Sequence, residues 1–200
     1  MPRLPSPTRD EIFALEPLSG LGLDHIVVVS TRQQADEALE ALIDSPVLGF
    51  DTESKPTFAK DEVSAGPHVV QFSTLNMAYV FQLHDARCRE VVATLLQSDR
   101  IAKVGFGLAS DHQQILRTLG IHPKNVLDLN VIFREKGYVR ELGVRAAIAV
   151  MFNQRFLKSR KATTSNWANR QLTSSQIVYS ANDAWAAIQV FQALGLKPAP

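Results

Sequence analysis

Two carboxylates close a short apolar segment of the chain, VLGFDTES at residues 47–54. The apolar residues favour a buried strand over 47–53, with Asp51 and Glu53 at its end. Side chains at alternate positions of a strand point to the same face, so the two carboxylates are expected to lie side by side. Like charges at a buried site are costly unless something offsets them, and any fold of this chain must meet that requirement.

Composition places the chain among soluble globular domains. Of its 200 residues, 46% are hydrophobic and 20% are charged. A single cysteine, Cys88, excludes an intrachain disulfide and a cysteine-rich zinc site. No apolar run approaches the roughly 18 residues of a membrane span, and the start MPRLPSPTRDE lacks the apolar core of a secretory signal. We therefore expect no membrane partner and a cytoplasmic location, or a nuclear one in a eukaryote.

The first half of the chain has the pattern of a sheet. We expect a flexible, proline-rich arm over residues 1–22, followed by a single domain over 23–196. Strands are predicted at 25–30, at 47–53 and twice within 68–83, and a helix begins near Thr31. The last three strands follow one another along the chain, which predicts an antiparallel meander.

The second half alternates between strands and helices. Helices are predicted at 88–98 and 108–120, with strands at 101–107 and 125–129. Helical structure continues from there, apart from a loop near 157–166. Thr173 and Gln176 have capping-box spacing before a long final helix at 174–194. The predicted fold class is α/β, with a mixed central sheet (the meander plus parallel strands) flanked by helices.

Helical phase adds two carboxylates that face the interior. Asp111 shares its helix face with the apolar residues Leu108 and Ile115. Tyr179 and Asp183 lie four residues apart on one face of the final helix, which continues with apolar residues. Each feature alone has an ordinary alternative. Asp51 and Glu53 form a D-x-E pair, which is common in strands. Asp111 alone fits a buried acid satisfied by a hydrogen bond, and Tyr179 with Asp183 fits a simple helical pair.

The charges of these four carboxylates favour a metal site. Unit charges about 4 Å apart repel by about 4 kcal/mol at an effective dielectric constant near 20, so protons or cations must offset them. Ligands that are all oxygen favour the hard ions Mg²⁺ or Mn²⁺. Two such ions about 4 Å apart suit hydrolysis of a phosphodiester. Asp128 is a further acid, which we interpret as a helix cap.

Three segments together resemble the motifs of the DEDDy family of 3′→5′ exonucleases, which includes Werner-type and ribonuclease D-type domains. They are FDTE, KVGFGLASD and YSAND, and the resemblance extends over roughly residues 25–194. It implies a ribonuclease H-like fold and two Mg²⁺ or Mn²⁺ ions per active site. It also implies that Asp51 bridges both ions and that Glu53 and Asp183 complete the first site.

The resemblance implies roles for two more residues at the reaction centre. Asp111 acts near the second ion through water. Tyr179 orients the attacking water, and its phenol, with a usual pKa near 10, suits hydrogen bonding better than proton abstraction.

Basic and aromatic residues supply candidates for nucleic-acid contacts. Between Glu141 and Asp183 the chain has no acidic residue but several basic ones, which suits a polyanion unless it is only a solvated surface. Within this segment Lys158 and Arg160 are the candidate phosphate contacts. Further candidates, with their alternatives, are Trp167, which closes the site or packs in the core, and Phe58, which stacks on a base or within its loop.

These features predict a metal-dependent 3′-5′ exonuclease that releases nucleoside 5′-monophosphates by a two-metal-ion mechanism. The expected partner is a nucleic acid with an accessible 3′ end, with DNA favoured over RNA. The alternatives are a non-catalytic nucleic-acid-binding or scaffold domain that retains the fold, and an oligonucleotide- or RNA-trimming exoribonuclease. Protein partners or oligomerisation are compatible with the sequence.

Overall fold

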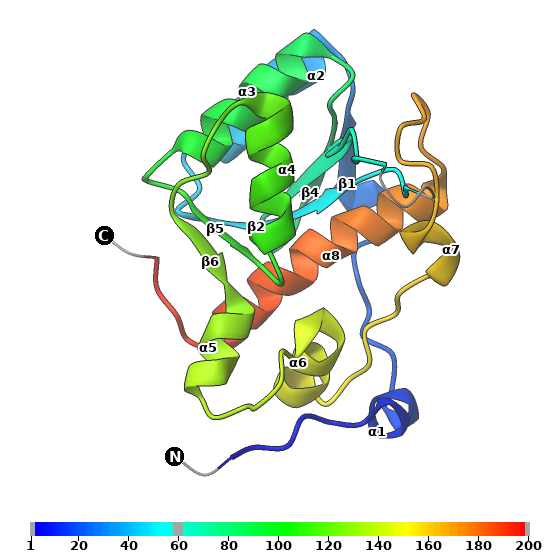
Figure 1. Cartoon of the computed structure of the whole chain (residues 1–200), viewed down its shortest axis with the longest axis vertical. Helices are drawn as coiled ribbons and strands as arrows, with labels where there is room; N and C mark the ends of the chain where they lie inside the picture. Colours follow the sequence, from blue (N-terminus) through cyan, green and yellow to red (C-terminus); the bar gives the residue numbers. More distant parts are fainter. Residues whose placement is uncertain (1–2, 58–61, 199–200) are drawn as a thin grey trace.

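A six-stranded sheet forms the centre of the computed structural model, which describes residues 3–57 and 62–198 (Figure 1). The strands are β1 (Ile26–Val29), β2 (Val47–Glu53), β3 (Val69–Ser73), β4 (Ala78–Gln82), β5 (Ala102–Gly105) and β6 (Val126–Asp128). They lie in the order β1-β4-β3-β2-β5-β6. The predicted antiparallel meander is confirmed, since β3 pairs antiparallel with both β2 and β4. The other neighbours pair in parallel, which makes the sheet mixed.

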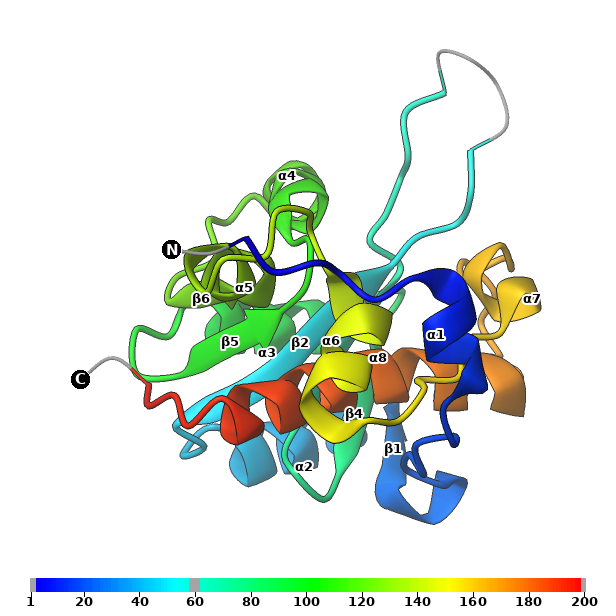
Figure 2. The ribbon, with the colours of Figure 1, turned by 90° about the horizontal axis from the view of Figure 1, so that it is seen from below.

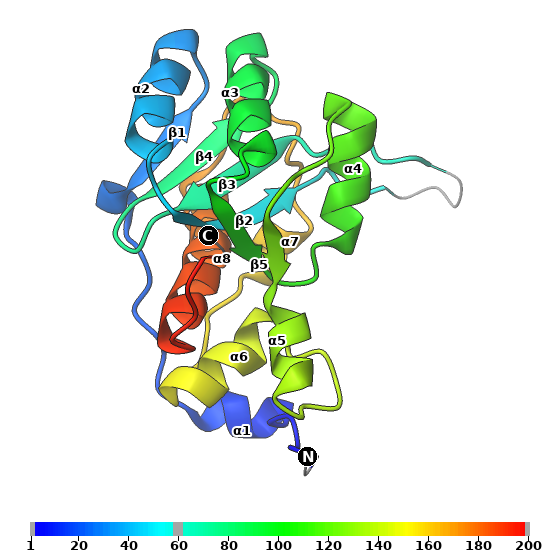
Figure 3. The same ribbon diagram turned by 90° about the vertical axis from the view of Figure 1, so that its left-hand side faces the viewer.

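Helices cover both faces of this sheet. They are α1 (Arg9–Ala14), α2 (Arg32–Leu42), α3 (Ala86–Gln97), α4 (Ala109–Leu119), α5 (Leu129–Glu135), α6 (Gly143–Phe152), α7 (Arg160–Thr163) and α8 (Ser174–Ala193). Helices α2 and α3 pack on one face, and α8 crosses the other (Figure 3). The predicted loop at 157–166 contains the short helix α7. Within the described residues, no helix is long and apolar enough to cross a membrane.

Helix α8 begins where the sequence predicts, because its capping box forms. The Thr173 side chain accepts a hydrogen bond from the Gln176 backbone N–H, and the Gln176 side chain accepts one from the Thr173 N–H. Two otherwise unpaired backbone donors are thereby satisfied. The helix then runs for 20 residues and carries Tyr179 and Asp183 on the side that faces the sheet.

The N-terminal segment, expected from its sequence to be a flexible arm, contains a short helix. Thr8 caps α1, and α1 lies beside α6 (Figure 2). Farther along, the Leu18 N–H donates to the carbonyl of Arg155 over 2.9 Å. The Asn182 side chain accepts from the Leu21 N–H over 2.7 Å and donates to the Leu21 carbonyl. These contacts lie far apart in sequence, so local patterns do not indicate them.

Close packing of α8 on β2 depends on Gly49. A Cβ atom at this position would lie 2.0 Å from the carbonyl oxygen of Ala184, the residue after Asp183. We expect Gly49→Ala to lower the free energy of unfolding by about 1–3 kcal/mol or more, because a backbone atom cannot move aside without shifting α8. Chemical denaturation measures the loss, with Gly120→Ala as a control at an open surface position whose cost is backbone strain alone. Equal stability of Gly49→Ala and wild type would contradict the packing described.

Candidate active site

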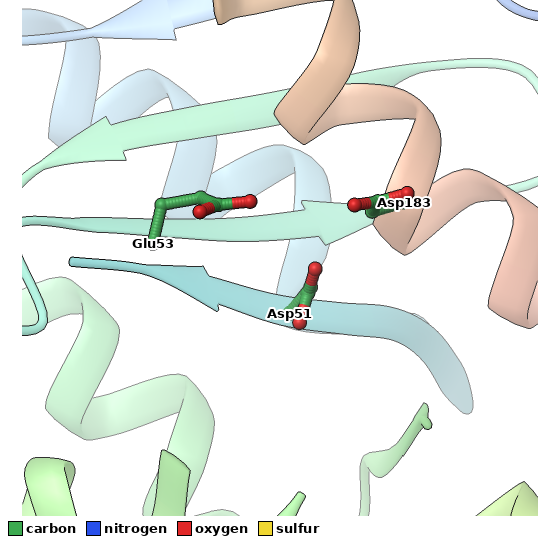
Figure 4. Close-up of side chains that lie close together, drawn as sticks. All are labelled: Asp51, Glu53 and Asp183. Carbon is green, nitrogen blue, oxygen red and sulfur yellow. The ribbon is translucent and has the colours of Figure 1, made fainter. Parts of the chain in front are cut away.

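Three carboxylates converge where β2 meets α8 (Figure 4). Asp51 and Glu53 project from the same face of β2, as strand alternation predicts, and Asp183 projects from α8 toward them. Ligand oxygens from the three residues all lie within 4.8 Å of one another. We call these residues the acid cluster.

The fourth predicted carboxylate, Asp111, lies beside the acid cluster rather than in it. Asp111 is 8% exposed and lies on the inward face of α4, as helical phase predicts. The Thr52 hydroxyl donates to Asp111 Oδ1, and the Ser110 hydroxyl approaches Oδ2 at 3.4 Å. Asp111 still acts on the cluster, since its charge is one of the causes that raise the pKa of Asp51.

Burial and mutual repulsion disfavour the charged forms of the cluster. Burial, followed by the charges of Asp183 and Asp111, raises the pKa of Asp51 well above its usual value. The pKa of Glu53 rises to about 9, first through burial and then through the charges of Asp51 and Asp183. Ionisation at neutral pH therefore requires a compensating cation.

Lys158 supplies one positive charge from the segment that leads to α7. Its Nζ lies 2.7 Å from Asp183 Oδ2 and 5.3 Å from the centroid of the Tyr179 ring. The sequence predicts Lys158 as a phosphate contact, whereas the structure pairs it with a cluster carboxylate. Burial lowers the pKa of Lys158, but the charges of Asp183 and Asp51 outweigh burial, so the pKa is raised and the ammonium persists.

The donor set of the cluster fits a hard divalent cation. All its ligand atoms are carboxylate oxygens, as Mg²⁺ and Mn²⁺ prefer. Asp183 Oδ1 is buried and has no hydrogen-bond partner among the described residues. Such an atom is costly to bury unless a donor or a cation satisfies it. Asp51, Glu53 and Asp183 are therefore the residues that would hold a metal ion.

Tyr179 is held at the edge of the acid cluster by two neighbours. The Thr163 hydroxyl, on α7, donates to the Tyr179 hydroxyl oxygen over 3.1 Å. The ring of Trp167 packs against the Tyr179 ring at a centroid distance of 6.0 Å. Burial and the charge of Asp183 raise the pKa of Tyr179 to about 12, so its phenol stays protonated and can donate a hydrogen bond at working pH.

The predicted nucleic-acid contacts have different outcomes. Trp167 is 1% exposed, which contradicts a direct contact with nucleic acid and agrees with the alternative of a packed core residue. Its ring contacts that of Tyr179. Arg160 is the first residue of α7, but its side chain lies outside the described part of the chain. Phe58 lies outside the described residues, in the connection between β2 and β3.

Open space adjoins the acid cluster on the side of α5 and α6. A cavity of about 380 Å³ is lined by Asp51, Asp183 and Lys158, and by Phe106 and Asn130 among others. A second cavity, of about 600 Å³, has Arg145, Lys158 and Tyr179 in its lining. Lys158 belongs to both, so together they leave room for a substrate beside the carboxylates.

Asp128 has a role that sequence reasoning found only in part. It caps α5 as predicted, accepting a hydrogen bond from the Asn130 N–H over 2.9 Å. It also accepts from the Gly107 and Leu108 N–H groups, both at 3.1 Å. Asp128 thus fixes the turn that starts α4 and places Asp111. Helix-capping patterns give no sign of this second contact, because it spans about twenty residues.

If the Tyr179 hydroxyl orients the attacking water, as the family resemblance implies, Tyr179→Phe should lower kcat for strand cleavage about a hundredfold while KM changes little. Steady-state kinetics on a labelled oligonucleotide measure both constants. Tyr79→Phe is the matched control, since Tyr79 lies on β4 and packs against the core on the opposite face. An unchanged kcat in Tyr179→Phe would rule out the role assigned to its hydroxyl.

Comparison with known proteins places these features in a family context. A family model described as 3′-5′ exonuclease matches residues 26–198. The mouse bifunctional 3′-5′ exonuclease/ATP-dependent helicase WRN is 26% identical over 156 residues, covering 77% of this chain but 11% of that protein. Human exonuclease 3′-5′ domain-containing protein 2 is 27% identical, covering 94% of this chain and 32% of its own length. The chain thus spans a minor part of these relatives.

Solved structures confirm the predicted ribonuclease H-like fold. Ribonuclease D of Trypanosoma brucei superposes with a TM-score of 0.77 at 20% identity, covering 84% of this chain and 64% of that one. The EXO domain of Aedes aegypti Nibbler gives a TM-score of 0.74 at 18% identity, covering 90% of this chain and 96% of that chain.

Proposed function

This chain belongs to the 3′-5′ exonuclease family, and from that premise we propose that it removes nucleotides from the 3′ end of a nucleic acid by metal-dependent hydrolysis. The observation that carries the proposal is the convergence of Asp51, Glu53 and Asp183 within 4.8 Å beside open space. The products are nucleoside 5′-monophosphates. All four motif carboxylates are present, which favours catalysis over a domain that only binds nucleic acid.

In this proposal Asp51, Glu53 and Asp183 would hold two Mg²⁺ or Mn²⁺ ions, and Asp51 would be a ligand of both. Bound there, such ions lower the pKa of the attacking water and stabilise the leaving oxygen. Asp111, held by its hydrogen bonds with Thr52 and Ser110, would act beside the second ion through water.

The neutral phenol of Tyr179 orients the attacking water by donating a hydrogen bond. Thr163 and Trp167 fix the position of that phenol, the first through its hydroxyl and the second through ring packing. Burial of the Tyr179 ring between these neighbours keeps its hydroxyl at the cluster edge.

We propose DNA as the preferred substrate, with RNA as the rival. The motif resemblance to Werner-type domains favours DNA, while a neighbour solved as Trypanosoma brucei ribonuclease D in complex with RNA U12 supports RNA. A digestion panel distinguishes them: single-stranded DNA, recessed-end duplex DNA and RNA of one sequence, each 5′-labelled, with Mg²⁺ or Mn²⁺. The proposal expects ladders shortened from the 3′ end and faster digestion of DNA. Faster digestion of RNA would reverse the substrate assignment, and no digestion of any strand would overturn the activity.

A further inference from the structure

We propose that Lys158 is an exchangeable internal cation of the acid cluster: it competes with metal for Asp183 and, once displaced, binds the phosphate of the substrate. The inference rests on the proposed function and deepens it. It assigns Lys158 two successive partners, a carboxylate and then a phosphate, and links metal loading to substrate binding through one side chain.

The contact between Lys158 and Asp183 disfavours a metal ion on the same oxygen. Lys158 Nζ lies 2.7 Å from Asp183 Oδ2, and the Asp183 side chain is only 4% exposed. A Mg²⁺ ion bonds its oxygen ligands at about 2.0–2.1 Å and requires near-octahedral access. An ammonium and a metal ion placed on one face of a buried carboxylate would also repel each other strongly. Metal coordination by Asp183 Oδ2 is therefore favoured when Lys158 moves away.

The side chain of Lys158 is free to make that move while its backbone stays in place. Arg145 donates a hydrogen bond from its guanidinium to the Lys158 carbonyl over 3.2 Å, which ties the backbone to α6. The side chain itself is 24% exposed, and its ammonium contacts Asp183 and the Tyr179 ring. A four-carbon lysine stem with rotatable bonds can redirect its ammonium by changing rotamers alone.

The displaced ammonium remains where a substrate would lie. Lys158 lines both cavities beside the cluster, together with Asp51 and Asp183 in one and Arg145 and Tyr179 in the other. Rotation away from Asp183 therefore leaves its charge facing open space next to the reacting centre. A phosphate group of the substrate strand is the anion available there, and a lysine ammonium binds phosphate as a point charge.

If Lys158 exchanges partners in this way, its replacement should strengthen Mn²⁺ binding and weaken binding of the nucleic-acid strand. Lys158→Met removes the competitor of the metal, so the protein alone should bind Mn²⁺ at least about tenfold more tightly. The same change removes a phosphate contact, so KM for the nucleic-acid strand should rise. A residue with a merely structural role would weaken both interactions or neither.

The test is calorimetric titration of Mn²⁺ into protein without nucleic acid. Wild type, Lys158→Met, Lys158→Arg and the control Lys161→Met are compared, since Lys161 is an exposed lysine of α7. We expect tighter binding only in Lys158→Met, with Lys158→Arg close to wild type. Equal or weaker Mn²⁺ binding by folded Lys158→Met, in a protein that still digests its strand, overturns the exchange alone. Absence of Mn²⁺ binding in wild type overturns the proposed function and the exchange together.

A second measurement uses the wild-type protein and does not depend on the folding of a variant. Acylation of lysines by an amine-reactive ester, read by mass spectrometry, reports how accessible each ammonium is. Exchange predicts that Mn²⁺ increases labelling of Lys158 and leaves labelling of Lys161 unchanged. Labelling of Lys158 that stays constant or falls when Mn²⁺ is added contradicts the exchange.

Discussion

Replacement of Asp51 by asparagine is expected to lower kcat for 3′-end cleavage by about a thousandfold or more. Asparagine keeps the shape of the side chain but removes a charge that would hold metal. Metal stabilisation of the transition state is worth several kcal/mol. Because each 1.36 kcal/mol changes the rate about tenfold, its loss corresponds to a rate decrease of about a thousandfold. Single-turnover digestion of a 5′-labelled strand in Mg²⁺ measures the change.

The fold of Asp51→Asn should remain intact, and its metal-free form should be at least as stable as wild type. Asp51 is disfavoured as a charged group by burial and by Asp183 and Asp111, so neutralising it relieves repulsion. Asp44→Asn is the matched control, because Asp44 is an exposed carboxylate before β2. Activity of Asp51→Asn within tenfold of wild type would exclude Asp51 as a metal ligand needed for catalysis.

A second large effect is expected in the pH dependence of stability. Glu53 has a pKa of about 9 in the folded protein and a usual value of 4.5. The folded state therefore holds a proton that the unfolded state has lost between these values. The stability from this proton is fully present below the usual pKa and is lost as pH rises through the folded pKa. Metal-free protein should lose stability as pH rises from the usual value of 4.5 to about 9.

Two comparisons isolate this effect in thermal or denaturant unfolding. Glu53→Gln should reduce the pH slope, because its amide carries no titrating proton, while the raised pKa of Asp51 keeps part of the slope. The pKa of His68 is lowered by burial, which contributes stability in the opposite sense, but it does so in wild type and variant alike. Added Mn²⁺ should stabilise wild type most at the higher pH, where the carboxylates ionise on binding. If stability depends on pH equally in Glu53→Gln and wild type, the raised pKa of Glu53 in the folded protein is contradicted.

The direction of each carboxylate follows from local periodicity. Strand alternation puts Asp51 and Glu53 on one face, and helical phase turns Asp111 and Asp183 inward, as the structure shows. Periodicity does not give the distance between faces, which depends on how closely α8 approaches β2 at Gly49. The sequence therefore predicted four converging acids, whereas the structure brings three within 4.8 Å and places Asp111 beside them.

The contacts missed from sequence join segments that are distant along the chain. In the sequence Lys158 is one of several basic residues of its segment, and only the tertiary structure brings it to Asp183. Trp167 follows a polar stretch that resembles a surface loop, yet it packs on Tyr179. The hydrogen bonds between Asn182 and Leu21 span 161 positions and tie the N-terminal segment to α8. No residue pattern within a single element encodes such pairings.

Digestion of a strand that carries different labels on its two ends tests the central claim most directly. Under conditions of limited turnover in Mg²⁺, the account predicts immediate release of the 3′ label as a nucleoside 5′-monophosphate. The 5′ label should remain on a ladder that shortens one nucleotide at a time, and a chelator should stop both processes. Early release of the 5′ label, internal fragments, or digestion that continues in chelator would contradict metal-dependent hydrolysis from the 3′ end.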